Sequence, residues 1–513
     1  MNNSPQNIEE MISFQNQENI AFKELGKESL TYQDLLIHVK KISKIIRNLE
    51  INNNDRVAIV LPNGSIAASA FLCVSNCAVS APLNPNYTNE EFEFYMRDLD
   101  VKLLICLDTE KDAVSAAKKL NITVAFIQIN NIESAGIFNI ENSNYFETEI
   151  EKSNQNDETL VLHTSGTTSR PKIVPLTNKN IMSSAHNISQ TLKLSSDDVC
   201  INIMPLFHIH GLIAVVLSSL YSGASVYFTP GFNALKFFMW LEESKPSWFS
   251  AVPTMHQAIL SRAPKNSKII NSSNLRFIRS SSSSLPPNIM SDLESTFHCP
   301  VVEAYGMTEA SHQMSSNSII RGAQVPGSVG VEAGPKVRVL LDGKLTSKPN
   351  MLGEIVINGD NVFAGYESND KANKDAFISD QESKKIWFRT GDQGKFDENG
   401  FLFITGRLKE IINRGGEKIS PREVDEVLMG HPFVDQAVTF SIPHKSLGED
   451  IAAVLVAKEG SEIDINQIRE FASKKLSSYK IPRQILVRDQ IPKGSTGKVQ
   501  RIGLAKQLGL ENE

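Results

Sequence analysis

The chain has 513 residues, of which 41% are hydrophobic, 21% charged and 7% aromatic. This composition is typical of a soluble globular protein, and the length predicts roughly three domains or subdomains of ~150 residues each. The formal net charge is −6 and there is no basic block, which argues against nucleic acid as the main partner but leaves nucleotides open. Every apolar run is shorter than the roughly 18 residues that a membrane span requires, so we expect no span.

The cysteines indicate a reducing compartment. There are five of them, an odd number, and their spacing is not that of metal ligands. We therefore expect buried structural thiols at Cys73, Cys77, Cys106, Cys200 and Cys299. The first residues have neither the basic start nor the apolar core of a signal peptide, so the expected location is cytoplasmic.

Helix and strand patterns alternate over the first two thirds of the chain. Residues 31–49 carry apolar side chains at helical spacing, and Thr31 with Asp34 predicts an N-cap. Short apolar runs at 56–61, 102–107, 124–129, 224–229 and 275–280 predict buried strands, with helical stretches between them. This alternation predicts an α/β fold built from stacked subdomains with largely parallel sheets.

The sequence pattern changes near residue 326. Glycine-rich strand-and-turn sequence predicts a β-rich subdomain at about 326–405, with a hairpin turn at "DENG", residues 397–400. The last unit predicts helices at 420–432 and 464–476 and strands at 435–442 and 451–457, a small α+β domain. We therefore expect a large body at 1–405, a hinge at 406–410 and a small C-terminal domain at 411–513.

The segment "TSGTTSRPK", residues 164–172, gathers hydroxyl side chains, a glycine and two cations. Backbone N–H groups and hydroxyls can wrap phosphates, and Arg170 and Lys172 add positive charge. The segment is not a P-loop, because the second glycine and the hydroxyl after the lysine are missing. It predicts a different kind of phosphate-binding loop.

Four later segments complete a recognisable set: "EAYGMTE" (303–309), which we expect to follow a strand, "RTGDQGKF" (389–396), "GRLKEIINRGGEKI" (406–419) and "PKGSTGK" (492–498). In this order they resemble the acyl-AMP-forming superfamily of acyl-CoA synthetases, luciferases and peptide-synthetase adenylation domains, from about residue 20 to 505. The resemblance implies an acid–thiol ligase that uses ATP, Mg²⁺ and coenzyme A. It also implies a large N-terminal body and a small mobile C-terminal domain. Ser169 and Ile173 replace two glycines of the usual first loop.

The resemblance also implies residue roles. Tyr305 would stack on adenine, Thr308 would bond the α-phosphate, Glu309 would bind Mg²⁺ and Asp392 would hold the ribose. The full implied ATP and AMP set is Thr164, Ser165, Gly166, Thr167, Thr168, Lys172, Ser283, Glu303, Ala304, Tyr305, Thr308, Asp392, Arg407 and Lys498. A core tyrosine is the alternative for Tyr305.

Lys498 resembles the family's catalytic lysine, whose ammonium stabilises charge on the α-phosphate. Adenylation excludes water, whereas thioester formation needs a path for the CoA thiol. A rotation of the C-terminal domain about Lys409 would serve both steps, with Gly415 and Gly416 close to CoA. A plain charged linker is the alternative for Lys409, and a flexible basic loop is the alternative for residues 492–498.

The segments "HTSGTTSRPK", "PLFHIHGL", "RSSSSSLPP", "EAYGMTEASHQMSSN" and "NRGGEKISP" resemble the oxalate–CoA ligase branch. That branch would place His208, Ser282 and His312 at the acid, and His208 also among the catalytic residues. Polar groups suit a short, doubly charged acid better than a fatty acid. His208 can instead be a general pocket gate, and His210 a turn cap.

Several alternatives stay open on the sequence. The acid can be another short-chain or aromatic carboxylic acid, and the acceptor can be the phosphopantetheine of a carrier protein. An acyl-AMP-binding protein without activity would need a broken catalytic set, yet Lys172, Glu309, Asp392, Arg407 and Lys498 are all present. A luciferase-like oxygenase does not suit a small polar pocket. The sequence does not indicate the oligomeric state.

Overall fold

The computed structural model describes residues 4–129, 134–141, 152–164, 171–380, 383–492 and 500–510. They form two compact units. The first comprises the described residues up to Thr164, from Lys172 to Lys336 and from Asn358 to Asp375, and the second comprises those from Val337 to Ile357 and from Ala376 onward. The mixed α/β class with a large N-terminal body and a smaller C-terminal domain agrees with the expectation from the sequence. The expected boundaries at residues 405 and 411 remain a prediction.

In the first unit, a sheet of seven described strands has the order β7-β6-β5-β3-β4-β8-β9. Its strands are β3 (Arg56–Val60), β4 (Val79–Pro82), β5 (Val101–Cys106), β6 (Thr123–Gln128), β7 (Asn139–Ile140), β8 (Glu158–Thr164) and β9 (Lys172–Thr177). β3 to β6 and β8 pair in parallel, whereas β7 and β9 are antiparallel edges. The inner strands are continuously apolar because helices cover both faces of this sheet.

The second sheet of this unit has nine described strands in the order β16-β15-β14-β13-β12-β10-β11-β1-β2. They are β1 (Ile20–Glu24), β2 (Leu30–Thr31), β10 (Val199–Asn202), β11 (Ser225–Phe228), β12 (Trp248–Ala251), β13 (Phe277–Ser280), β14 (Val301–Met307), β15 (His312–Ser316) and β16 (Val331–Glu332). β1 and β10 to β14 are parallel neighbours. Their carboxyl ends therefore share one edge, where open α/β sheets place their ligands.

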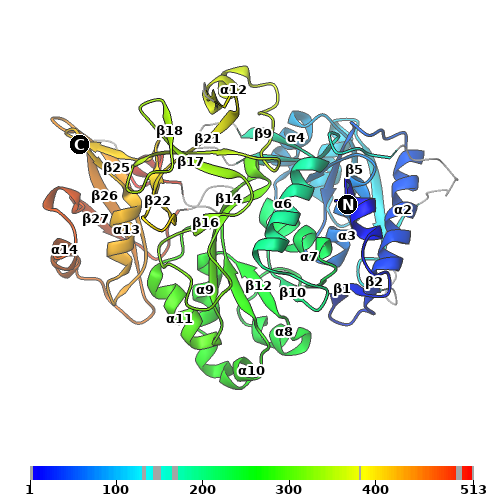
Figure 1. Cartoon of the computed structure of the whole chain (residues 1–513), viewed down its shortest axis with the longest axis horizontal. Helices are drawn as coiled ribbons and strands as arrows, with labels where there is room; N and C mark the ends of the chain where they lie inside the picture. The colour runs from blue at the N-terminus through cyan, green and yellow to red at the C-terminus, as the bar shows by residue number, and fades with distance from the viewer. Residues whose placement is uncertain are drawn as a thin grey trace. The chain divides into compact units, whose positions relative to one another are not determined.

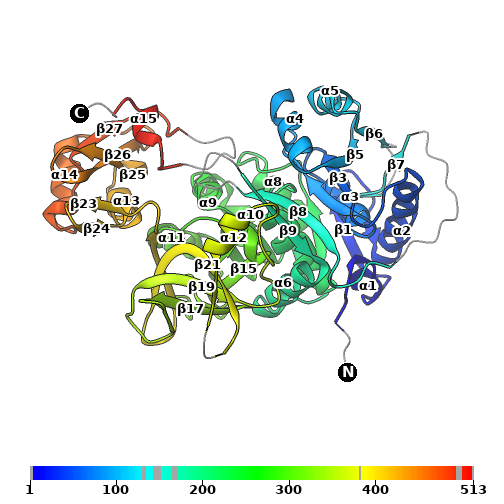
Figure 2. The same cartoon turned by 90° about the horizontal axis from the view of Figure 1, so that it is seen from above.

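Helices connect and cover the two sheets. They are α1 (Ile8–Ser13), α2 (Tyr32–Asn48), α3 (Ser65–Ser75), α4 (Asn89–Asp98), α5 (Lys111–Lys119), α6 (Asn178–Thr191), the π-helix η1 (His210–Leu217), α7 (Ser218–Tyr221), α8 (Phe237–Ser244), α9 (Pro253–Leu260), η2 (Ala263–Asn266), α10 (Ser267–Asn271), α11 (Pro287–Phe297), η3 (Thr308–Ala310) and α12 (Asp370–Ala376). α6 contacts both β9 and β15, and α3 contacts β1, β3 and β4, so these two helices lie between the sheets (Figure 1). Figure 2 shows α4 and α5 side by side next to β5 and β6.

Local predictions hold well in this unit. Thr31 caps α2 and its side chain accepts a hydrogen bond from Asp34 N, while Leu35, Val39 and Ile42 are buried on the predicted face. All five cysteines are buried and free, as expected. Burial in apolar surroundings raises the pKa of the Cys77 thiol to about 12, so this thiol stays protonated. No described helix is long and apolar enough to cross a bilayer.

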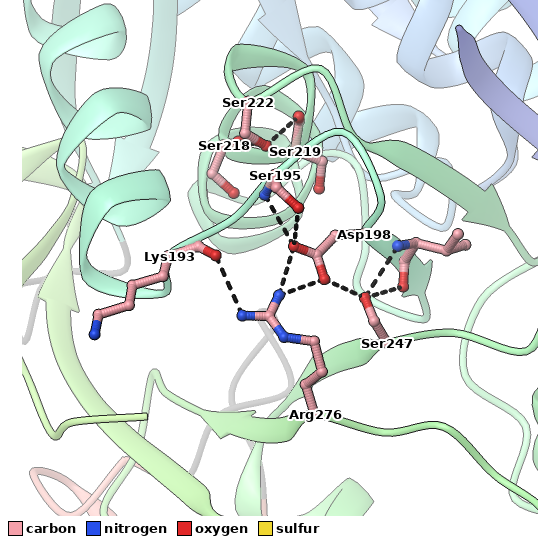
Figure 3. A network of polar contacts seen from close by, with 9 residues as sticks. Lys193, Ser195, Asp198, Ser218, Ser219, Ser222, Ser247 and Arg276 are labelled. Carbon is pink, nitrogen blue, oxygen red and sulfur yellow. Dashed lines mark hydrogen bonds and ion pairs between the residues drawn. The ribbon is translucent and has the colours of Figure 1, made fainter. Parts of the chain in front are cut away.

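An ion pair between a half-exposed arginine and a buried aspartate holds the amino ends of β10 and β13 together (Figure 3). Asp198, directly before β10, pairs with Arg276, directly before β13. Ser247 Oγ donates to the same carboxylate at 2.6 Å, and Ser195 N donates at 2.9 Å. The carboxylate is almost fully buried, so these donors replace its hydration.

The second unit contains two sheets. The β-rich sheet has the order β18-β17-β19-β21-β20, with β22 on β21. Its strands are β17 (Lys336–Leu341), β18 (Lys344–Thr346), β19 (Gly353–Asn358), β20 (Phe377–Ser379), β21 (Ile386–Phe396) and β22 (Leu402–Arg407). The predicted "DENG" turn joins β21 and β22, whose register pairs Phe396 with Leu402.

The other sheet of this unit has the order β24-β23-β26-β25, with β27 on β26. Its elements are β23 (Ile412–Arg414), β24 (Glu417–Ile419), α13 (Pro421–Met429), β25 (Val434–His444), β26 (Gly448–Ala457), α14 (Ile465–Ser473), η4 (Ser478–Lys480), β27 (Gln484–Val487) and α15 (Leu504–Gln507). The predicted helices and strands of this part are all present. Apolar clusters lie on both faces of the long β25–β26 hairpin.

Candidate functional site

The turn after β14 carries the proposed nucleotide and metal residues. The sequence placed residues 303–309 after a strand, but this placement is wrong, because antiparallel pairing with β15 extends β14 to Met307. Tyr305 therefore lies in the strand and is buried, and Thr308 and Glu309 open η3. Glu309 is buried, and its carbonyl accepts a hydrogen bond from Phe363 N at 2.9 Å.

Tyr366 connects two of the expected functional residues. Its hydroxyl donates to Glu309 Oε1 at 2.8 Å, and Lys172 Nζ lies 4.1 Å from the centre of its ring. All three residues belong to the first unit. The sequence reasoning did not find Tyr366. The available signal was an aromatic residue directly after a glycine in the connection between β19 and α12.

The connection that contains Tyr366 also fixes the backbone after Glu309, through Asn361. Asn361 Nδ2 donates to the carbonyl oxygens of Ala310 and Gln313, at 2.8 and 2.9 Å. Asn361 is completely buried. The backbone around Glu309 is thus fixed by side-chain and main-chain bonds from a segment about fifty residues away in the sequence.

The proposed phosphate loop is described only at its ends. Thr164 and Lys172 are register partners on the antiparallel strands β8 and β9. Ser165, Gly166, Thr167, Thr168, Ser169 and Arg170 lie outside the described residues. Ile173 has a clear structural role: it packs in the core with Val161 and Leu104, and its carbonyl accepts from Glu367 N. A glycine here would leave part of that core unfilled.

The proposed acyl residues meet in a polar cluster at the carboxyl ends of β12 and β13. Ser282 Oγ lies 3.0 Å from His210 Nδ1, and His210 Nε2 lies 2.6 Å from Ser250 Oγ. The rings of His210 and His312 have centroids 4.9 Å apart. The structure thus brings together the predicted Ser282 and His312. It adds His210, which the sequence offered beside His208 with a turn cap as the alternative, and Ser250, which the sequence missed.

His208 lies two residues before His210, half-buried, with its ring against Phe207. Its carbonyl accepts from Leu212 N at 3.1 Å at the entrance to η1. Backbone at π-helical turns often belongs to functional sites.

Arg279 is a further polar residue at this cluster. It is completely buried on β13, and its guanidinium contacts Ser250 Oγ at 3.4 Å, His312 Nδ1 at 3.4 Å and Gln313 Oε1 at 3.2 Å. Burial lowers the pKa of the guanidinium from 12.5 to about 9, so it stays charged at neutral pH. Sequence reasoning gave this residue no role, although it is the first residue of the segment "RSSSSSLPP", because only Ser282 of that segment was expected at the acid.

The remaining expected residues of this unit have ordinary structural partners. Glu303 is buried, and Oε1 accepts from Leu285 N at 2.9 Å. The carbonyl of Ala304 accepts from Ser281 Oγ at 2.8 Å, while Ser283 is exposed. These contacts fix the segment after β13 against β14, whether or not the side chains also touch a nucleotide.

In the second unit, Asp392 and Arg407 are cross-strand partners on β21 and β22. Arg407 Nε donates to Asp392 Oδ1 at 2.9 Å, and the carboxylate is buried. A carboxylate has about four acceptor sites, so this bond is compatible with ribose hydroxyls as further donors. Lys409 is exposed in the turn after β22.

Gly415 and Gly416 form the two-residue turn between β23 and β24, at φ values of +61° and +99°. Such turns need positive φ at both positions, which favours glycine. The hairpin alone therefore accounts for both glycines, and their role toward CoA remains a prediction. Lys498 lies outside the described residues. Arg501, just beyond that segment, pairs with Asp425 on α13 and with Glu410.

Comparison with known proteins identifies the class. The family model "AMP-binding enzyme" matches residues 12–367, and "AMP-binding enzyme C-terminal domain" matches residues 423–498. The chain therefore belongs to the AMP-binding enzyme family and is an AMP-forming CoA ligase.

The similar proteins include several CoA ligases. An oxalate–CoA ligase of Arabidopsis thaliana is 42% identical, with 93% of each chain covered. An oxalate–CoA ligase of Saccharomyces cerevisiae is 39% identical, over 93% of this chain and 92% of its own. Among solved structures, ATP-bound MatB from Rhodopseudomonas palustris superposes with a TM-score of 0.86 at 25% identity, covering 98% of this chain and 99% of MatB.

Proposed function

We propose that the protein joins oxalate to coenzyme A through an oxalyl-adenylate, with release of diphosphate and then AMP. The observation that carries the choice of acid is the polar cluster of Ser282, His210, Arg279 and His312, which contrasts with the apolar pocket that a fatty acid requires. Oxalate has no apolar surface, so hydrogen bonds and charge must bind it. The 42% and 39% identical relatives named oxalate–CoA ligases support the proposal.

In the first half-reaction, a carboxylate oxygen of the acid attacks the α-phosphorus of ATP, and the bond to diphosphate breaks. Lys172 and the segment 164–170 would hold the leaving diphosphate. Thr308 would bond the α-phosphate and Tyr305 would support the adenine. Lys498 would stabilise the negative charge that develops on the α-phosphate oxygens.

Glu309 fits the proposed role of a Mg²⁺ ligand. Among the described residues, no group of three or more histidine, cysteine, aspartate or glutamate side chains could form an all-protein metal site. Mg²⁺ suits such an arrangement, because it binds through one or two carboxylates together with phosphate oxygens and waters. The bond from Tyr366 fixes the carboxylate of Glu309 in one orientation. When bound, the ion would neutralise phosphate charge.

In the second half-reaction, the CoA thiol attacks the acyl carbon and AMP departs. Asp392 and Arg407 would hold the ribose of the nucleotide through both steps. A change of domain orientation about Lys409 would withdraw Lys498 and bring Gly415 and Gly416 to the pantetheine. We expect this chemistry in the cytoplasm.

A panel of acids tests the proposal. Diphosphate release would be measured with ATP and Mg²⁺ for oxalate, malonate, acetate, hexanoate and coumarate, and thioester formation with free CoA for those that react. Oxalate is expected to give the highest kcat/KM. Preference for hexanoate or coumarate would contradict the choice of acid, and adenylation without transfer to free CoA would favour a carrier-protein acceptor.

A further inference from the structure

A chain of hydrogen bonds connects the exposed Ser282 with a fully buried cation. The order of contacts is Ser282, His210, Ser250 and Arg279. One terminal nitrogen of the guanidinium contacts Ser250, and the other contacts His312. Ser250 and Arg279 are register partners on β12 and β13, so the sheet itself sets their separation. The whole chain of contacts lies within the first unit.

The charge of Arg279 has no acidic partner in the described part of the chain. Its guanidinium contacts Ser250, His312 and Gln313, all of which are neutral acceptors. A fully buried charge without a counter-ion is costly, and proteins retain such groups mainly at functional sites. This arrangement creates a positive potential beside Ser282 and His312 that an anion would relieve.

The guanidinium sets the direction of its own hydrogen bonds, because it can only donate. Toward His312 it donates to Nδ1, so the proton of the neutral ring lies on Nε2. Toward Ser250 it donates to Oγ, and the other contact described for that hydroxyl is His210 Nε2. Accepting from Arg279 leaves the hydroxyl proton of Ser250 free for His210 Nε2, and with Ser250 as the donor the ring proton of His210 lies on Nδ1.

His210 Nδ1 then donates to Ser282 Oγ, and the hydroxyl proton of Ser282 is available for a ligand. Ser282 and His312 also have left-handed backbone conformations, at φ values of +71° and +100°. Non-glycine residues rarely adopt such values, and these conformations gather at ligand sites. Both side chains are thus held in place by unusual backbone as well as by directed hydrogen bonds.

We propose that Arg279 is a positioning residue that selects doubly charged acids. It orients Ser282 and His312 as hydrogen-bond donors, and its positive charge is compensated by the second carboxylate of a short diacid. This inference rests on the proposed function, in which Ser282 and His312 bind the acid. A monocarboxylate leaves the charge uncompensated and therefore binds less well.

The first test replaces the guanidinium by a neutral side chain of similar length, Arg279→Met. The KM for oxalate is expected to rise about tenfold or more, which corresponds to the loss of hydrogen bonds from a charged donor. The KM for ATP should stay within about twofold, since the contacts described for Arg279 are with Ser250, His312 and Gln313 and not with the proposed nucleotide residues. Arg279→Lys keeps the charge but cannot bond Ser250 and His312 together, so an intermediate KM is expected.

Arg276→Met is the matched control. It removes an arginine directly before the same strand and breaks the pair with Asp198, but it leaves the polar cluster intact (Figure 3). This variant should lose stability while its KM for oxalate stays at the wild-type value. The comparison separates a local effect of Arg279 from a general effect of destabilisation.

The second test reads the proton positions directly by nitrogen-15 NMR of histidine-labelled protein without substrate. His312 should carry its proton on Nε2 and His210 on Nδ1, with both patterns lost in Arg279→Met. A proton on Nδ1 of His312, or a folded Arg279→Met with an unchanged KM for oxalate, would overturn the inference. If Arg279→Met does not fold, the KM of Arg279→Lys for oxalate and the histidine proton positions in the wild-type spectrum test the inference instead. A wild-type enzyme that prefers monocarboxylic acids would instead contradict the proposed function, whatever the spectrum shows.

Discussion

Replacing Tyr366 by phenylalanine removes one oxygen atom at the proposed metal site. The ring that lies 4.1 Å from Lys172 Nζ is retained, while the 2.8 Å bond to Glu309 Oε1 is lost. A hydrogen bond to a charged group contributes about 1.5–3 kcal/mol. If that bond orients Glu309 for Mg²⁺, its loss should weaken the apparent Mg²⁺ affinity about 10- to 100-fold.

The assay is the initial rate of diphosphate release against Mg²⁺ concentration, at saturating ATP and acid. Tyr32→Phe provides a matched control, because the buried Tyr32 hydroxyl donates to the carbonyl of Ala224 at 2.7 Å, away from Glu309. Both variants should lose some stability to urea, but the Mg²⁺ half-saturation should shift only in Tyr366→Phe. A shift of less than about twofold in Tyr366→Phe would refute the positioning role of this tyrosine.

Three further changes probe the reaction and the fold. Lys498→Met should reduce adenylation by orders of magnitude yet retain thioester formation from synthetic acyl-adenylate, and equal loss of both steps would contradict its proposed role. Arg276→Met should lower the free energy of unfolding by about 3 kcal/mol in urea, because Asp198 stays buried without its cation; an unchanged midpoint would contradict this. Burial lowers the pKa of His256 from 6.5 to about 4, so the unfolded chain binds a proton at higher pH than the folded chain. Stability is therefore full above pH 6.5 and falls toward pH 4, by about 2 kcal/mol at pH 5, and His256→Phe should flatten this part of the urea-midpoint profile.

Much of the fold could be predicted because its signals are local. The apolar face of α2 and its Thr31 cap follow from spacing within one helix, and both agree with the structure. The strands β3, β11 and β13 lie within the predicted apolar runs, and β5 and β6 each begin one residue before theirs. The error at residues 303–309 has a tertiary cause, since pairing with β15 places residues 304–307 in the strand, beyond Glu303, which pairs with β13.

The site was predictable where its residues belong to contiguous motifs. Glu309, Asp392 and Arg407 come from such segments, and the structure shows the cross-strand pair of the last two. Tyr366 lies outside the segments that the sequence singled out, and Arg279 opens the segment "RSSSSSLPP" but had no assigned role there. Their importance depends on partners far along the chain, such as Glu309 for the tyrosine and Ser250 for the arginine.

The sequence by itself determined the order of helices and strands and the chemistry of the loops, because hydrophobic period and turn residues act over a few positions. Only the tertiary structure decided which polar groups share one buried environment. Hydrogen-bond direction and the cost of a buried charge depend on neighbours brought together by sheet register, and no local pattern records them. The placement of a donor-only cation behind Ser282 and His312 is therefore a property of the fold.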